Sequence, residues 1–120
     1  MMNIDKVLKI LNNGEYIEIE EKRESSNLYS ESSYMVTLKE GGMIRIKQII
    51  SIGTFYKISL FVPNEEKSIE SWMFEKRRIG LLSRKTVKDP LFDEVSSTFM
   101  NLYCDYSKRK ASEHSKYFPQ

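Results

Sequence analysis

Five carboxylates fall within ten residues near the start of the sequence, and they form its densest set of groups able to bind a proton or a metal. They are Glu15, Glu18, Glu20, Glu21 and Glu24. No His or Asp stands among them, and no apolar surround raises a carboxyl pKa, so general acid–base chemistry and metal binding are not indicated. The pattern predicts either the exposed face of an edge strand or an acidic strip that presents carboxylates where a nucleic-acid-binding partner expects phosphates.

The two residue types that most often act as nucleophile and base each occur once. Cys104 is the single cysteine, which excludes an internal disulfide and a thiolate metal cluster. It is expected on the side of its helix away from the main apolar stripe, near Met100, as a small apolar filler and not a nucleophile, since no His lies within one helical turn of it. His114 stands in a polar C-terminal segment with no partner group nearby. The sequence therefore predicts a protein without catalytic residues, metal or cofactor.

A basic stretch, EKRRIGLLSRKTVKDP, runs from residue 75 to residue 90. Its cations are Lys76, Arg77, Arg78, Arg84, Lys85 and Lys88, with no acid between the first and the last. A second cluster, Lys108, Arg109 and Lys110, follows on the last expected helix. If both clusters face the same side, they form one basic patch able to neutralise phosphates or acidic side chains. Alternatively, these charges are solvated and the second cluster complements a helix dipole.

Length and composition indicate a single compact domain over residues 1–120. Of these residues, 40% are hydrophobic and 30% charged, and the net charge is only +2. Residues 1–40 carry eight acids and five bases (net −3), whereas residues 41–120 carry nine acids and fourteen bases (net +5). No apolar run is long enough to span a membrane and no signal pattern opens the sequence, so a cytoplasmic, non-membrane protein is expected.

The first elements follow from the spacing of apolar residues. Ile4, Val7, Leu8 and Leu11 predict a short helix that Asn3 caps and Gly14 ends. The alternation in EYIEIEEK predicts a strand with Ile17 and Ile19 on one face. Residues 23–33 are polar and Ser-rich, and they predict a loop.

Three further strand-like runs are YMVTLKE, MIRIKQIISI and FYKISLFV. Gly41-Gly42 and Gly53-Thr54 separate them, which predicts hairpins and an antiparallel meander. Arg45, Lys47 and Lys57 should share a sheet face with Phe55 and Phe61. Such a face could stack single-stranded bases, or it could be an ordinary second face whose rings lie under Lys and Arg stems.

The C-terminal third is expected to be helical. Residues 68–79 fit a helix through Ile69, Trp72, Met73 and Lys76, although Trp72 and Phe74 would equally share the face of a fifth strand. A clearer helical stripe follows at Leu91, Val95, Phe99, Leu102 and Tyr106. The polar end after about residue 110 is expected to fray. The predicted fold is α+β: a four-stranded antiparallel meander with a short N-terminal helix and C-terminal helices packed on one face.

These observations predict a small non-enzymatic binding protein whose partner is a protein or a protein–nucleic acid complex. A short chain rich in Lys, Ile, Ser and Glu resembles in composition the accessory proteins of phages and mobile elements, which include anti-CRISPR proteins and other inhibitors of host proteins. The alternative is a nucleic-acid-binding module that uses the basic segments 76–88 and 108–110.

Overall fold

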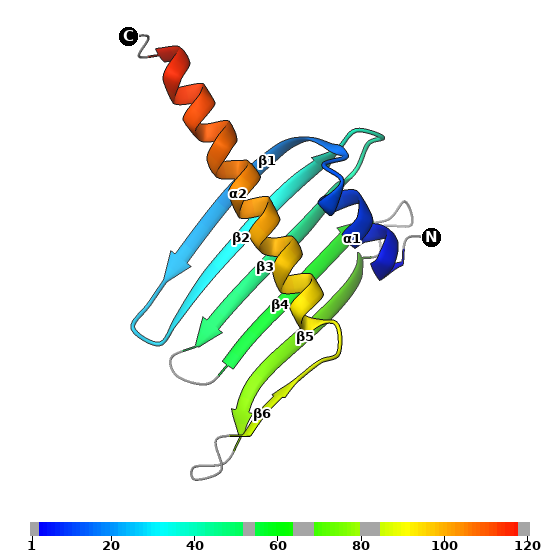
Figure 1. The fold of residues 1–120 in the computed structure, drawn as a ribbon, viewed down its shortest axis with the longest axis vertical. Coiled ribbons are helices and arrows are strands. Elements are labelled where there is room, and N and C mark those ends of the chain that lie inside the picture. Colours follow the sequence, from blue (N-terminus) through cyan, green and yellow to red (C-terminus); the bar gives the residue numbers. More distant parts are fainter. Residues whose placement is uncertain (1–2, 52–54, 64–68, 80–84, 118–120) are drawn as a thin grey trace.

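A computed structural model describes residues 3–51, 55–63, 69–79 and 85–117, and it confirms the α+β class (Figure 1). One open sheet contains six strands in the order β1-β2-β3-β4-β5-β6, with each neighbouring pair antiparallel. The strands are β1 (Tyr16–Ser25), β2 (Tyr29–Leu38), β3 (Met43–Ser51), β4 (Phe55–Pro63), β5 (Ile69–Ile79) and β6 (Lys85–Lys88). The helices are α1 (Ile4–Asn12) and α2 (Phe92–Tyr117). The meander is confirmed, but four strands were too few.

The predicted first helix is present as α1. The Asn3 side chain accepts a hydrogen bond from the Lys6 backbone N–H at 2.8 Å, which satisfies a donor that the first helical turn leaves free. Val7, Leu8 and Leu11 are buried, as their spacing predicts. The chain then turns through Gly14, whose φ of 68° lies in the left-handed region.

The loop predicted over residues 23–33 is wrong, because this segment forms the end of a β-hairpin. β1 continues to Ser25, β2 begins at Tyr29, and Arg23 lies opposite Ser32 in the ladder. The Ser26 hydroxyl accepts from the Leu28 and Tyr29 N–H groups at 3.2 and 3.3 Å, which closes the turn. The polar composition therefore reflects solvent exposure, while the hydrogen bonds between the strands hold the backbone extended.

The alternation predicted for the first strand is wrong at its start. A register shift between Tyr16 and Glu18 marks a β-bulge, which inserts one residue into the alternation. As a result Tyr16 and Ile19 both face the core, while Ile17 is 62% exposed.

The Gly-Gly hairpin joins β2 and β3 as predicted, through a turn of residues 39–42. Gly41 and Gly42 have φ values of 98° and 86°, and the Leu38 N–H donates to the Gly42 carbonyl at 3.0 Å. Residues other than Gly rarely adopt two such positive φ angles in succession. The predicted Gly53-Thr54 turn lies outside the described residues.

Of the two alternatives for residues 68–79, the helix is wrong and the fifth strand is confirmed, since Ile69–Ile79 forms the strand β5. Trp72 lies opposite Leu60 and Phe74 opposite Ile58, so both rings share the core face of the sheet. The spacing of Ile69, Trp72 and Met73 fits a helix only by coincidence. Among the described residues, one C-terminal helix, α2, packs on the sheet beside α1, and the short strand β6 precedes it.

α2 supplies the cover that the apolar stripe predicts. Val95 and Leu102 are fully buried, and Phe92 and Phe99 nearly so. The predicted fraying after about residue 110 is not seen, since the helix continues to Tyr117 and its last turns extend past the edge of the sheet at β1 (Figure 1). Residues 107–113 are all exposed. None of the described helices is long and apolar enough to cross a membrane.

Candidate binding surface: the open face of the sheet

Both helices pack on the same side of the sheet (Figure 1). The other side, which we call the open face, carries the alternate side chains of all six strands. No described element covers this open face. It is thus a continuous surface of the sheet that the described fold leaves without a second layer.

Apolar side chains run across the open face. They are Tyr29, Met35, Met43, Ile49, Phe55, Phe61, Met73 and Val87. Met73 is 58% exposed, while Phe55 and Phe61 are half-buried among their cross-strand neighbours. The structure confirms that these two rings share a face with Arg45, Lys47 and Lys57. A solvated sheet face usually shows polar residues, so this apolar content indicates a surface suited to contact.

The charges on the open face are separated by strand. β1 and β2 carry Glu18, Glu20, Glu24 and Glu31 with one cation, Lys22. We call this region the acidic half. β3, β4 and β5 carry Arg45, Lys47, Lys57 and Arg77 with one acid, Glu75. We call this region the basic half.

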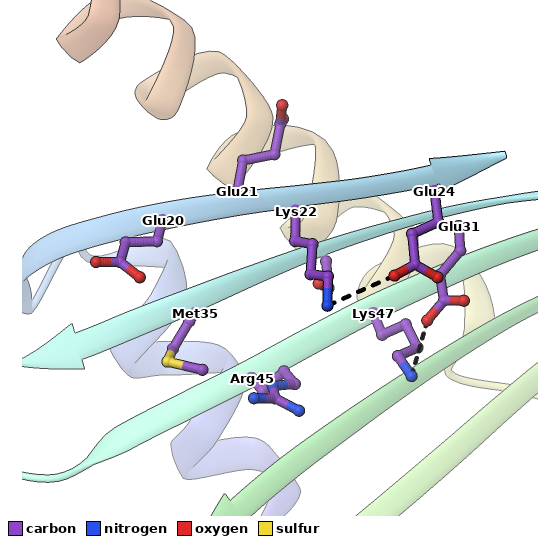
Figure 2. A pocket seen from close by; sticks show the side chains of 9 residues that line it. Glu20, Glu21, Lys22, Glu24, Glu31, Met35, Arg45 and Lys47 are labelled. Carbon is purple, nitrogen blue, oxygen red and sulfur yellow. Dashed lines mark ion pairs between the residues drawn. The ribbon is translucent and has the colours of Figure 1, made fainter.

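A shallow hollow of about 210 Å³ lies where the two halves meet (Figure 2). Lys47 Nζ lies 2.8 Å from Glu31 Oε1, and Lys22 Nζ lies 3.5 Å from Glu24 Oε1. Arg45 points into the same hollow, and no carboxylate of the described residues lies within ion-pair distance of its guanidinium. The hollow is therefore lined by charges of both signs, only part of which pair within the chain.

The predicted acidic strip is divided between two sides of the sheet. Glu18, Glu20 and Glu24 alternate on the open face, whereas Glu15 precedes β1. Glu21 points to the helix side, where it accepts a hydrogen bond from the Tyr34 hydroxyl at 2.5 Å. Strand alternation explains this division, because consecutive residues point to opposite faces.

The cations of the basic stretch, residues 76–88, are likewise divided between the two sides of the sheet. Arg77 lies on the open face, whereas Lys76 lies on the helix side with its ammonium 5.8 Å from the centre of the Tyr56 ring. Lys88 forms an ion pair with Asp93, and its hydrogen bond lowers the pKa of that carboxyl. Arg84 and the side chains of Arg78 and Lys85 lie outside the described part of the chain.

The second basic cluster contacts its own helix and β1. Arg109 pairs with Asp105 at 3.2 Å and donates to the Ile17 carbonyl at 3.0 Å. Lys110 lies 3.7 Å from Glu113, and Lys108 is exposed. This end of α2 and the strand β6 lie at opposite ends of the molecule (Figure 1). The structure does not bring the two clusters into one patch.

Two tyrosine–carboxylate–arginine groups lie on the helix side of the sheet, one between β1 and α2 and one between β2 and β1, and nothing in the local sequence pattern indicates them. The Tyr16 hydroxyl donates to Asp105 at 2.5 Å, and Arg109 pairs with that carboxylate. The Tyr34 hydroxyl donates to Glu21 in the same manner, and Arg23 pairs with Glu21 at 3.0 Å. Burial and the neighbouring carboxylate raise the pKa of both tyrosines.

These groups are structural in position. Each one joins residues of different elements, and the contacts among the rings of Tyr34, Phe99 and Tyr106 belong to the core. No cluster of three or more His, Cys, Asp or Glu within the described ranges is placed to hold a metal ion. Cys104 is exposed, which agrees with its predicted place on the side of α2 away from the apolar stripe, whereas the prediction that it is an apolar filler is wrong.

Comparison with known proteins gives no match: no family model fits the chain, and no curated protein and no solved structure is significantly similar to it.

Proposed function

We propose that this chain is a non-catalytic binding protein that docks a partner protein on the open face of its sheet. The observation that carries the proposal is the uncovered face itself, where exposed Met73 and half-buried Phe55 and Phe61 lie among separated charges. Apolar groups surrounded by charged and polar ones are typical of surfaces that bind other proteins.

The partner we propose is a protein that stands alone or in complex with nucleic acid. Its surface should place cations against the acidic half and carboxylates against the basic half, because complementary charges speed association and exclude wrong partners. The composition of the chain supports a role as an inhibitor of a host protein, of the kind that phages and mobile elements encode.

Two exposed methionines provide a matched test of this surface. Met73 lies on the open face at 58% exposure, and Met100 lies on the outer side of α2 at 51% exposure. Met73→Glu should abolish capture of the partner from a host lysate, whereas Met100→Glu should capture as the parent does. Thermal melts should show that both variants are folded. Equal capture by the two variants would exclude the open face as the docking surface.

A labelled single-stranded oligonucleotide separates protein binding from direct nucleic-acid binding. We expect no salt-dependent rise in fluorescence anisotropy when the parent protein is added. Micromolar or tighter binding that falls steeply with salt, and that Arg45→Ser with Lys57→Ser removes, would instead show a nucleic-acid-binding module.

A further inference from the structure

We propose that the outer edge of β1 binds an extended, basic segment of a partner protein, which pairs with it as a seventh, antiparallel strand beside the end of α2. The site is the backbone edge of the sheet and not its open face, so it goes beyond the proposed function and does not rest on it. Three observations support it: the outward-pointing backbone groups of β1, a groove between β1 and α2, and an excess of acidic side chains on β1.

The outer edge of β1 carries backbone groups that no described strand pairs with. β1 is the first strand of the sheet, and β2 is its neighbour in the ladder. At the end of this hairpin the Ser26 N–H donates to the Tyr29 carbonyl at 2.8 Å. In an antiparallel ladder such hydrogen-bonded pairs alternate with pairs whose N–H and C=O groups point away from each other. By this alternation the outward groups of β1 include those of Ile19, Glu21 and Arg23, and such an edge is a template for another strand.

A groove of about 480 Å³ runs between this edge and α2. β1 lines it from Ile17 to Glu21, and α2 lines it with residues between Tyr106 and Glu113. The last turns of α2 extend past the edge of the sheet at β1, so they would flank a strand added there (Figure 1). Arg109 holds α2 in this position through its hydrogen bond to the Ile17 carbonyl at 3.0 Å. The groove therefore has one wall that can pair with a strand and one helical wall.

The side chains of β1 favour a basic occupant. The strand carries four acids and two bases, namely Glu18, Glu20, Glu21 and Glu24 with Lys22 and Arg23. Glu21 and Arg23 pair with each other at 3.0 Å on the helix side. The net negative charge therefore lies on the other side of the strand. Opposite charges on directly facing residues of neighbouring strands stabilise the pair, and like charges destabilise it, so the added strand should place Lys or Arg at alternate positions.

The remaining positions of the added strand should be apolar. Their side chains would lie on the helix side, next to Ile19 and the half-buried ring of Tyr106. The hydrocarbon stems of Arg109 and Lys110 provide further apolar surface there. Ile17, at 62% exposure, is an apolar side chain in the same groove. The partner segment thus alternates basic and apolar residues, with β-branched side chains suited to an extended strand.

A fluorescein-labelled peptide, Lys-Val-Glu-Val-Lys-Val-Lys, is the probe. Paired antiparallel, its Lys residues face Glu24, Glu20 and Glu18, its Glu faces Lys22, and its Val residues lie on the helix side. Fluorescence anisotropy should rise as protein is added up to about 100 µM. The charge-inverted peptide, Glu-Val-Lys-Val-Glu-Val-Glu, should not bind. A probe that stays free, or an inverted peptide that binds equally well, would overturn the inference.

Backbone N-methylation of the probe tests strand pairing without any change in the protein. In the antiparallel arrangement the Val residues face Ile19, Glu21 and Arg23, so the Val N–H groups donate to β1 while the Lys N–H groups point away. N-methylation of the Val residues should weaken binding by about tenfold or more, whereas N-methylation of the Lys residues should change it little. Equal affinities of the two methylated peptides would overturn the pairing.

Matched variants locate the site on the protein. Glu20→Lys should weaken binding of the probe by about tenfold, whereas Glu94→Lys, an equal change of charge at an exposed position in the first turn of α2, should not. Circular dichroism can verify that both variants are folded. Met73→Glu on the open face should also bind the probe as the parent does, which separates this site from the proposed docking surface. Loss of the probe in Met73→Glu, or its normal binding to Glu20→Lys, would overturn the inference.

Discussion

Removal of one buried hydroxyl, by Tyr34→Phe, tests how firmly β1 and β2 are joined beneath α2. Tyr34 is fully buried, and its hydroxyl donates to Glu21 at 2.5 Å. The ring of the Phe variant can keep its contacts with Phe99 and Tyr106, whose centres lie 5.2 and 5.7 Å away. The substitution therefore removes one hydrogen bond and little packing.

The expected loss follows from the surroundings of the carboxylate. A hydrogen bond to a charged group contributes about 1.5–3 kcal/mol to the free energy of unfolding. Glu21 retains its ion pair with Arg23 at 3.0 Å, which compensates for part of the loss. We expect the free energy of unfolding to fall by about 2 kcal/mol, at the lower end of this range.

Urea unfolding followed by circular dichroism measures this change, and Tyr29→Phe is the control. Tyr29 lies in β2 with an exposed ring, so loss of its hydroxyl should change the free energy of unfolding by less than about 0.5 kcal/mol. Tyr34→Phe and Glu21→Ala should also be non-additive when combined, because each removes the same hydrogen bond. A Tyr34→Phe midpoint equal to that of Tyr29→Phe would refute the reasoning.

Further predictions concern the core, the hairpin and alkaline pH. Leu102→Ala should lower the free energy of unfolding by about 2–5 kcal/mol in urea titrations, because a fully buried side chain leaves a cavity; an unchanged midpoint would show that α2 is not docked. Gly41→Val with Gly42→Val should lower the melting temperature, since Val resists the positive φ angles there; a melt like that of the parent would exclude this turn. The raised pKa values of Tyr16 and Tyr34 stabilise the fold below pH 10, the ordinary tyrosine pKa, and this stabilisation is lost as the pH rises above it. The free energy of unfolding should therefore fall above about pH 10, and it should fall less steeply when both tyrosines are replaced by Phe.

The sequence predicts the elements in which one periodicity dominates. The stripe of α2 and the alternation in β3 and β4 give the correct element and the correct face. For β5 the sequence favoured a helix and left a fifth strand open, because Trp72 fits periods of both 2 and 3.6. The end of the β1–β2 hairpin was mistaken for a loop because its side chains are polar on both faces, so no apolar alternation marks the strands.

The candidate surface was predictable only in part. Alternation correctly places Phe55 and Phe61 with Lys57 on one face of the sheet. A run of cations in the sequence, however, does not remain a cluster in a strand, because Lys76 and Arg77 point to opposite faces. The acidic half could not be predicted either, since it includes Glu31 from a segment predicted to be a loop.

The order of elements along the chain also has a consequence for biosynthesis. Each strand pairs with its neighbour in sequence, so hairpins can form as they leave the ribosome. The contacts that close the core span nearly the whole chain, as between Asn12 and Thr98 or Tyr16 and Asp105. Until α2 has been translated, the ring of Tyr34 on the helix side of the sheet lacks its contacts with Phe99 and Tyr106. The nascent sheet should therefore be a substrate for chaperones that bind exposed apolar surface, and it should lose that affinity when α2 docks.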